Sequence, residues 1–141
     1  MQGLNVEESR QLKGVGLKIT LPRLRVLQIF EQSAMHHLSA EEIYKALSDL
    51  GEEVGLATVY RVLTQFEEAG LVKRHHFEEG HSVFELCHGA HHDHLVCVKC
   101  RKIVEFVDEV IEERQAKIAE KTGFKMTDHA LTIYGLCQAC H

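Results

Sequence analysis

Apolar side chains recur at helical spacing through residues 7–71. In "TLPRLRVLQIF" they follow Thr20, a residue type that caps helix N-termini, and a proline lies in the first turn. The segment "LSAEEIYKALSDLGEE" opens with Ser39 and has Glu42 three residues later, which is the pattern of a capping box. "LATVYRVLTQFEEAGLV" carries a third apolar stripe and ends at Gly70. This half therefore predicts short helices joined by brief turns.

The pattern changes to β-rich runs in "LVKRHHFEEGHSVFEL", where two such runs flank Glu78–Gly80. Alternating residues on both sides of a glycine-containing turn predict a β-hairpin. Helices followed by a two-stranded hairpin outline a winged helix-turn-helix domain. In such a domain the helix just before the hairpin enters the major groove of DNA.

Beyond residue 90 the pattern predicts a second, smaller unit. "HLVCVKC", "KIVEFV" and "HALTIYGLC" are expected to be strands, and "DEVIEERQAKIAEKTG" is expected to be a helix that stops at Gly123. A unit of this size holds little core, so a metal or an oligomer interface should help to stabilise it. The predicted fold class is α+β. The expected domains are residues 1–86 and 87–141, with the boundary around "LCHGA".

Composition restricts the class of protein. The 141 residues are 45% hydrophobic, which suits a globular chain, and no run approaches the roughly 20 apolar residues of a membrane span. "MQGLNVEESR" has no apolar stretch typical of a signal peptide, so we expect a cytoplasmic protein without a membrane partner. In a reducing compartment, five cysteines favour metal binding or redox chemistry over structural disulfides.

Charge is distributed unevenly along the chain. The formal net charge is −5, yet residues 9–30 contain no acid. This cationic stripe on an acidic protein is the arrangement expected if one face meets an anion such as DNA. A solvated helix face is the alternative, and charge alone does not separate the two. The stripe consists of Arg10, Lys13, Lys18, Arg23 and Arg25.

The predicted recognition helix combines an apolar stripe with polar side chains on its exposed side. Arg61 could read a guanine edge, and the neighbouring Tyr60 could contact a thymine methyl group. The other alternative is an ordinary solvated face. The exposed positions are Thr58, Arg61, Thr64 and Gln65, with Tyr60 nearby.

Two CxxC pairs supply four thiolates, which is the tetrahedral ligand set of structural zinc. They are Cys97 with Cys100 and Cys137 with Cys140, and residues 101–136 separate them. Zinc there would fasten a turn to the C-terminal segment and leave no open position for catalysis. A thioredoxin-like redox pair is the alternative. Cys87 is left over and is expected to be a buried or bystander thiol.

The stretch "HHDH" predicts ligands for two further sites. In an extended strand successive side chains point to opposite faces, so His92 and His94 share one face while His91 and Asp93 share the other. Mixed imidazole and carboxylate ligation suits zinc, iron(II), manganese or nickel. A polar strand edge without metal is the alternative. Candidate partners elsewhere in the chain are His37, Glu85, Glu105, Glu112 and His129.

The motifs "GLKITLPRLRVL", "GLATVYRVLTQFEEAGLV", "SVFEL", "HHDHLVCVKC" and "IVEF" resemble those of the ferric uptake regulator family. The resemblance is collinear over about residues 10–140. It implies a dimeric, metal-dependent transcriptional repressor. It also implies an N-terminal winged-helix domain and a C-terminal α+β dimerisation domain.

Carried over by position, the resemblance implies three metal sites and a DNA-contacting set. The regulatory site spans both domains and comprises His37, Glu85, His92, His94 and Glu105. A second site in the dimerisation domain comprises His91, Asp93, Glu112 and His129. The structural Zn²⁺ site comprises Cys97, Cys100, Cys137 and Cys140. Tyr60 and Arg61 match the base-contacting pair, Lys18 matches a minor-groove contact, and Thr58 lies on the same helix.

Glutamates at positions 85 and 105 resemble the pattern of the iron-responsive branch of the family. Peroxide-sensing relatives tend to carry aspartates at these positions, and zinc-sensing relatives often have a cysteine among the regulatory ligands. The implied function is an iron(II)-dependent repressor of iron-uptake genes at a two-fold-symmetric, AT-rich operator. Fe²⁺ is the implied regulatory ion, with Mn²⁺ or Co²⁺ as mimics. The expected assembly is a homodimer, or alternatively a tetramer. Two features depart from the family pattern: Cys87 lies close to Glu85, and Arg101 stands where the family commonly has glycine.

Other classes of function are also considered. A zinc- or peroxide-sensing relative would share the fold. A zinc hydrolase or deaminase is disfavoured, because Val96 precedes Cys97 where the deaminase motif has proline. A metal buffer would need neither a cationic stripe nor a recognition helix. The chain is therefore not expected to be an enzyme.

Overall fold

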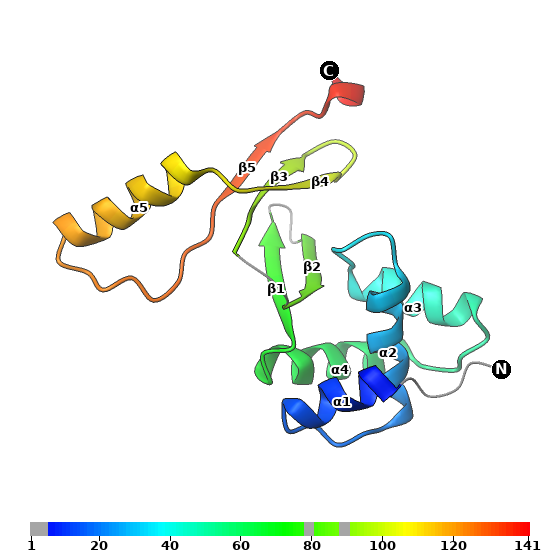
Figure 1. The fold of residues 1–141 in the computed structure, drawn as a ribbon. Helices are drawn as coiled ribbons and strands as arrows, with labels where there is room; N and C mark the ends of the chain where they lie inside the picture. Colours follow the sequence, from blue (N-terminus) through cyan, green and yellow to red (C-terminus); the bar gives the residue numbers. More distant parts are fainter. Residues whose placement is uncertain (1–5, 78–80, 88–90) are drawn as a thin grey trace. The chain divides into compact units, whose positions relative to one another are not determined.

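A computed structural model describes residues 6–77, 81–87 and 91–141. The predicted hairpin turn at Glu78–Gly80 lies outside these ranges. The chain forms two compact units, Met1–His88 and Gly89–His141 (Figure 1). Within the described residues, no helix combines the length and the apolar character needed to cross a membrane.

The first unit contains four helices: α1 (Val6–Gly14), α2 (Leu21–Gln32), α3 (Ala40–Asp49) and α4 (Leu56–Glu68). The predicted caps are confirmed at two of them. The Thr20 side chain accepts a hydrogen bond from the Arg23 backbone N–H at the start of α2. Ser39 and Glu42 form both bonds of the capping box that starts α3. These side chains satisfy N–H groups that the first helical turn leaves without a partner.

The four helices gather around one hydrophobic core (Figure 1). The helices α2, α3 and α4 contribute the apolar stripes that the sequence predicted, α1 adds Leu12, and the following hairpin closes one side of the core. Such burial is the main favourable term in folding, at about 25 cal/mol per Å² of apolar surface. The most deeply buried members are Leu12, Leu24, Val26, Leu27, Ile43, Leu47, Val59, Leu63, Phe66, Val72 and Phe84.

The predicted hairpin is present as β1 (Val72–Phe77) and β2 (His81–Leu86), which pair antiparallel. Gly70 has a φ of 79° just after α4, a conformation that favours glycine and that turns the chain into β1. Backbone hydrogen bonds in both directions join Phe84 to Leu38, which precedes α3. The wing is therefore attached to the helices by backbone bonds as well as by its buried side chains.

The second unit contains β3 (Asp93–Cys97), β4 (Ile103–Phe106), α5 (Glu109–Lys121), β5 (Thr132–Gly135) and the 3₁₀ turn η2 (Gln138–Cys140). β3 lies in the middle of the sheet, antiparallel to β4 and parallel to β5 (Figure 1). The helix α5 makes the crossover that a parallel pair requires. Both units together give the α+β fold expected from the sequence.

Burial in the second unit is sparse. α5 buries none of its side chains, and Val110 and Ile118 on it are exposed. Among the described apolar residues of this unit, only Val96 and Cys97 are buried. A unit with so little core depends on additional stabilisation, as its length suggested.

Candidate functional site

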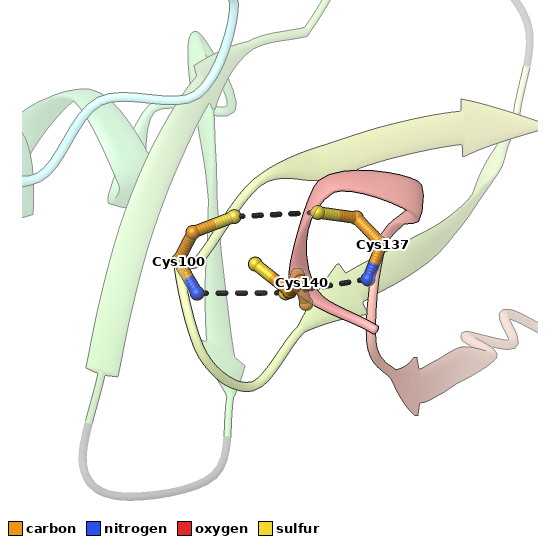
Figure 2. Close-up of side chains that lie close together, drawn as sticks. Cys100, Cys137 and Cys140 are labelled. Carbon is orange, nitrogen blue, oxygen red and sulfur yellow. Dashed lines mark hydrogen bonds between the residues drawn. The ribbon is translucent and has the colours of Figure 1, made fainter.

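The four cysteines of the two CxxC pairs come together in the second unit. One pair begins at the last residue of β3 and the other frames η2, and the four sulfur atoms all lie within 4.8 Å of one another. Figure 2 shows Cys100 and Cys137 facing each other from these two segments, with Sγ atoms 3.6 Å apart. Two backbone N–H groups point at Cys97 Sγ, those of Cys100 at 3.4 Å and Cys137 at 3.5 Å. Four converging sulfurs are the donor set that structural zinc prefers.

The thiols of this cluster differ in acidity. Hydrogen bonds from the backbone N–H groups of Cys100 and Cys137 lower the pKa of Cys97 to about 5, because they stabilise its thiolate. Hydrogen bonding with Cys137 is the largest of the effects that raise the pKa of Cys140 to about 12. One sulfur is thus a preformed anion to which a cation can add. Cys140 must release its proton when a metal binds.

Arg101 follows this cluster in a conformation that is costly for any residue with a Cβ. Its φ is 66°, the one positive value at a non-glycine position among the described residues. The conformation lets its N–H donate to the Cys97 carbonyl oxygen at 2.9 Å and close the turn. The left-handed region disfavours L-residues by about 1–2 kcal/mol. Arg101, which stands where the family commonly has glycine, therefore has a backbone conformation that suits glycine best.

Replacing Arg101 with glycine is expected to raise the free energy of unfolding of the zinc-loaded protein by about 0.5–1 kcal/mol. Relief of the left-handed strain exceeds the extra chain entropy of an unfolded glycine. Guanidinium unfolding at fixed zinc measures the change. Lys99→Gly is the matched control, since Lys99 lies in the same turn without a positive φ, and it should lower stability. A less stable Arg101→Gly protein would contradict this account of the turn.

A second cluster in the same unit joins β3 to α5 and to the segment before β5. Glu112 lies between two imidazoles: its Oε2 is hydrogen-bonded to His129 Nε2 at 2.7 Å, and its Oε1 lies 3.2 Å from His91 Nε2. The two rings are 4.2 Å apart between centroids. Asp93 Oδ1 lies 3.0 Å from the same His91 nitrogen. His91, Glu112 and His129 bring ligand atoms within 4.8 Å of one another, and Asp93, the fourth residue that the resemblance implied, joins them through its contact with His91.

This cluster suits a divalent cation. Asp93 is fully buried, and its Oδ2 has no hydrogen-bond partner among the described residues. A buried carboxylate oxygen without a partner is costly, and a metal ion satisfies it. Two imidazoles with two carboxylates are a donor set for zinc, manganese or iron(II).

The other face of the same extended segment carries a third group of possible ligands, His92, His94 and Glu105. His92 and His94 lie with ring centroids 4.9 Å apart, and His92 Nε2 is 3.6 Å from Glu105 Oε1. Glu105 is the β4 residue directly paired with His94. The division of His92 and His94 from His91 and Asp93, expected from strand alternation, is therefore confirmed.

In the first unit, His37 and Glu85 are buried and in contact, with Nε2 and Oε2 3.1 Å apart. His75 contacts the other oxygen of the same carboxylate. His75 is a member of this group that sequence reasoning missed. The signal was present in the hairpin, because Lys73 pairs with Glu85 and His75 lies two residues further along the same face.

Cys87 does not join any of these clusters within the described residues. It is exposed just after β2, and its N–H donates to the Leu71 carbonyl oxygen at 2.9 Å. Desolvation, followed by the nearby Glu85 carboxylate, raises the pKa of its thiol.

The helix α4 has the burial expected of a recognition helix. Its apolar stripe is buried, while Tyr60, Arg61 and Thr64 are exposed. The predicted exposure is only partly correct for Thr58 and Gln65, which are half-buried. Gln65 is engaged, because its Oε1 accepts from Arg23 Nε at 3.2 Å and from Nη2 at 3.0 Å.

The cationic stripe is similarly divided. Arg25 is engaged with Glu52, with Nε 3.1 Å from Oε1, and Arg23 is held against Gln65. Lys13 and Lys18 are exposed. Two of the five cations, Arg23 and Arg25, are therefore engaged in contacts within the protein. Lys18 keeps the exposure needed for a DNA contact.

The chain is similar to known proteins over most of its length. The model of the ferric uptake regulator family matches residues 14–134. A ferric uptake regulation protein of Legionella pneumophila is 73% identical over 135 residues, which cover 96% of this chain and 99% of the relative.

Two solved structures extend the similarity to three dimensions. The crystal structure of the Vibrio cholerae ferric uptake regulator has a TM-score of 0.86 at 58% identity and covers 92% of this chain and 98% of its own. A Francisella tularensis ferric uptake regulator with iron has a TM-score of 0.84 at 43% identity, covering 89% and 95%. The fold, the gathered ligands and these matches lead to one conclusion: the chain belongs to the ferric uptake regulator family.

Proposed function

We propose that this protein is an iron(II)-dependent transcriptional repressor of iron-uptake genes, and not an enzyme. The observation that carries the proposal is a set of imidazole and carboxylate ligands divided between the two units. The Legionella pneumophila relative is a ferric uptake regulation protein, and the Francisella tularensis relative has a structure with iron. Residues 1–86 would be the DNA-binding domain and residues 87–141 the metal-binding dimerisation domain.

Neither half of the regulatory set alone supplies the four or more protein ligands that would hold an ion without water. The first unit offers His37 and Glu85 in contact, and the second offers His92 with His94 and Glu105. Transition metals in proteins take four or more ligands. Ligation by both halves would restrict the units to one relative orientation. It would favour DNA binding only as far as that orientation binds the ion better than others do.

The other two metal sites have a different role in this proposal. The cluster of four cysteines would hold zinc permanently and stabilise the second unit, which has almost no core of its own. The cluster of His91, Asp93, Glu112 and His129 would hold a second divalent ion within that unit. Neither set spans both units, so neither has the means to link metal binding to their orientation.

The DNA partner follows from the exposed side chains of the first unit. Arg61 has the donors to read a guanine edge, and the Tyr60 ring can contact a thymine methyl. Thr58 would lie at the edge of that contact, and Lys18 would enter a narrow AT-rich minor groove. A homodimer presents two such surfaces and therefore prefers a two-fold-symmetric operator. The protein would act in the cytoplasm, where the operator is accessible.

The proposal is tested by operator affinity under anaerobic conditions, on protein whose bound zinc has been counted. We expect iron(II), and to a lesser degree manganese(II) or cobalt(II), to tighten sequence-specific binding while one zinc per chain remains bound. A protein that shows no metal-dependent, sequence-specific shift would instead be a zinc enzyme or a metal buffer. A response to zinc alone would favour a zinc-sensing relative.

His37→Ala is expected to raise the iron(II) concentration needed for half-maximal operator binding by on the order of 100-fold, because it removes a ligand that the first unit supplies. The readout is a metal titration of operator binding by fluorescence anisotropy. His36→Ala is the matched control, since His36 is adjacent and exposed. If His37→Ala responded to iron(II) as the unaltered protein does, the two-unit ligand set would be wrong.

A further inference from the structure

The phenol of Tyr60 is engaged with a carboxylate from another helix. Its hydroxyl donates to Glu41, with Oε1 at 2.9 Å and Oε2 at 3.0 Å. Glu41 lies in the first turn of α3, whereas Tyr60 lies in the N-terminal half of α4. Both residues are exposed, so neither side chain is fixed by packing alone. The bond is a tertiary contact confined to the first unit.

Glu42, the acid next to Glu41, is not available to accept the Tyr60 hydrogen bond. Glu42 accepts from the Ser39 backbone N–H in the capping box and is directed back along α3. Glu41 has no such local duty, and its carboxylate reaches across to α4 instead. A hydrogen bond to an ionised acceptor is about twice as strong as a neutral one. The bond therefore restrains two otherwise mobile side chains at the exposed end of the recognition helix.

The electrostatics agree with this geometry. Hydrogen bonding to Glu41 is the largest effect that raises the pKa of Tyr60, and the charge of Arg74 opposes it. Tyr60 thus keeps its proton at neutral pH, and that single proton is directed at Glu41. The hydroxyl has no second proton to donate to a phosphate or a base. What remains for DNA is the aromatic ring.

We propose that Glu41 is a positioning residue that determines DNA specificity, because it holds the Tyr60 ring in one orientation for contact with a thymine methyl group. This inference rests on the proposed DNA-binding function. A ring held in place contacts the methyl without first losing rotamer entropy, whereas a free ring must be ordered on binding.

The charge of Glu41 has a second consequence. A carboxylate within hydrogen-bond distance of a base-contacting phenol must itself lie close to the DNA. It repels phosphates, so it weakens binding to every sequence and most of all to DNA that offers no compensating base contact. Glu41 therefore improves discrimination both by ordering Tyr60 and by opposing non-specific association.

Three substitutions separate these roles. Glu41→Ala removes the acceptor and the charge, Glu41→Gln keeps an acceptor oxygen and removes only the charge, and Tyr60→Phe keeps the ring and removes the donor. Each is measured as the full-length, zinc- and iron(II)-loaded protein. Affinities are determined for the operator, for the operator with deoxyuridine in place of each thymine in turn, and for a scrambled duplex.

Deoxyuridine lacks only the thymine methyl, so its effect reports the ring contact directly. In the unaltered protein, one deoxyuridine position should weaken binding about fourfold, which corresponds to the burial of one methyl group. Glu41→Ala and Tyr60→Phe should each make this loss smaller, because an unrestrained ring occupies several orientations and contacts the methyl in only some of the complexes, and the double variant should have no further effect. Glu41→Gln should keep the loss but bind the scrambled duplex a few-fold more tightly.

The controls and the contrary results are distinct. Tyr44→Phe alters another exposed tyrosine on α3, and Glu53→Ala removes another exposed acid from the same unit, so both should retain the deoxyuridine effect. A full deoxyuridine effect in Glu41→Ala or Tyr60→Phe would overturn the positioning role. If the unaltered protein itself did not prefer operator to scrambled DNA, the proposed function would fail instead.

Discussion

Cys97→Ser is expected to remove the bound zinc and with it the fold of the second unit. Cys97 is the buried member of the cysteine cluster, its thiol has a pKa lowered to about 5, and it receives the N–H groups of Cys100 and Cys137. Serine is a poor zinc ligand, and three cysteines hold zinc much more weakly than four. Structural zinc contributes on the order of 10 kcal/mol to the folding of small domains, and this unit buries almost nothing else.

The result is measured as zinc per chain and as amide protection across residues 91–141. The first unit should retain its protection, because its core lies entirely within its own helices and hairpin. Cys87→Ser is the matched control, since Cys87 is exposed and belongs to no cluster of the described residues. A Cys97→Ser protein with full zinc content and a protected second unit would show that the cluster is not the structural site.

Arg61→Ala is expected to have the largest effect on operator recognition. A bidentate contact to guanine contributes about 1–3 kcal/mol of discrimination, so each half-site should lose about 5- to 150-fold in specific affinity. Binding to scrambled DNA should change far less. Lys18→Ala should instead weaken all sequences by a similar factor and reduce the dependence of binding on salt, because a minor-groove or phosphate contact carries little base information.

Competition binding of operator against scrambled duplex at several salt concentrations separates the two effects. Arg10→Ala is the matched control for the loss of one positive charge, since Arg10 is exposed on α1 and lies 3.9 Å from Glu7. An Arg61→Ala protein whose specificity ratio equals that of Arg10→Ala would mean that Arg61 contributes charge and does not read a base.

Local features of the sequence were sufficient for most of the fold. Thr20 and Ser39 cap helices because their side chains bond to N–H groups three residues away, which depends on nothing beyond the segment itself. Strand alternation likewise separated His91 and Asp93 from His92 and His94 before any partner was known. Each CxxC pair is a local turn, and the preference of zinc for four thiolates predicted that the two distant pairs form one cluster.

The family resemblance supplied partners that local reasoning left open. Glu112 and His129 lie 17 residues apart, and strand or helix periodicity does not relate them. The match by position brought them to the same site as His91, and the geometry agrees. His75 shows the limit of that approach, because it contacts Glu85 but has no place in the ligand set that the resemblance implies.

By itself the sequence determined the order of most helices and strands, which faces of the "HHDH" segment carry ligands, and that four cysteines form one set. Only the tertiary structure decided which charged and polar side chains are already engaged: Arg25 with Glu52, Gln65 with Arg23, and Tyr60 with Glu41. It also decided that Arg101 has a φ of 66°. The physical reason is the distance along the sequence between the residues that interact. Caps and periodicity depend on neighbours a few residues away, whereas these contacts join residues far apart in the chain that meet only when the core forms.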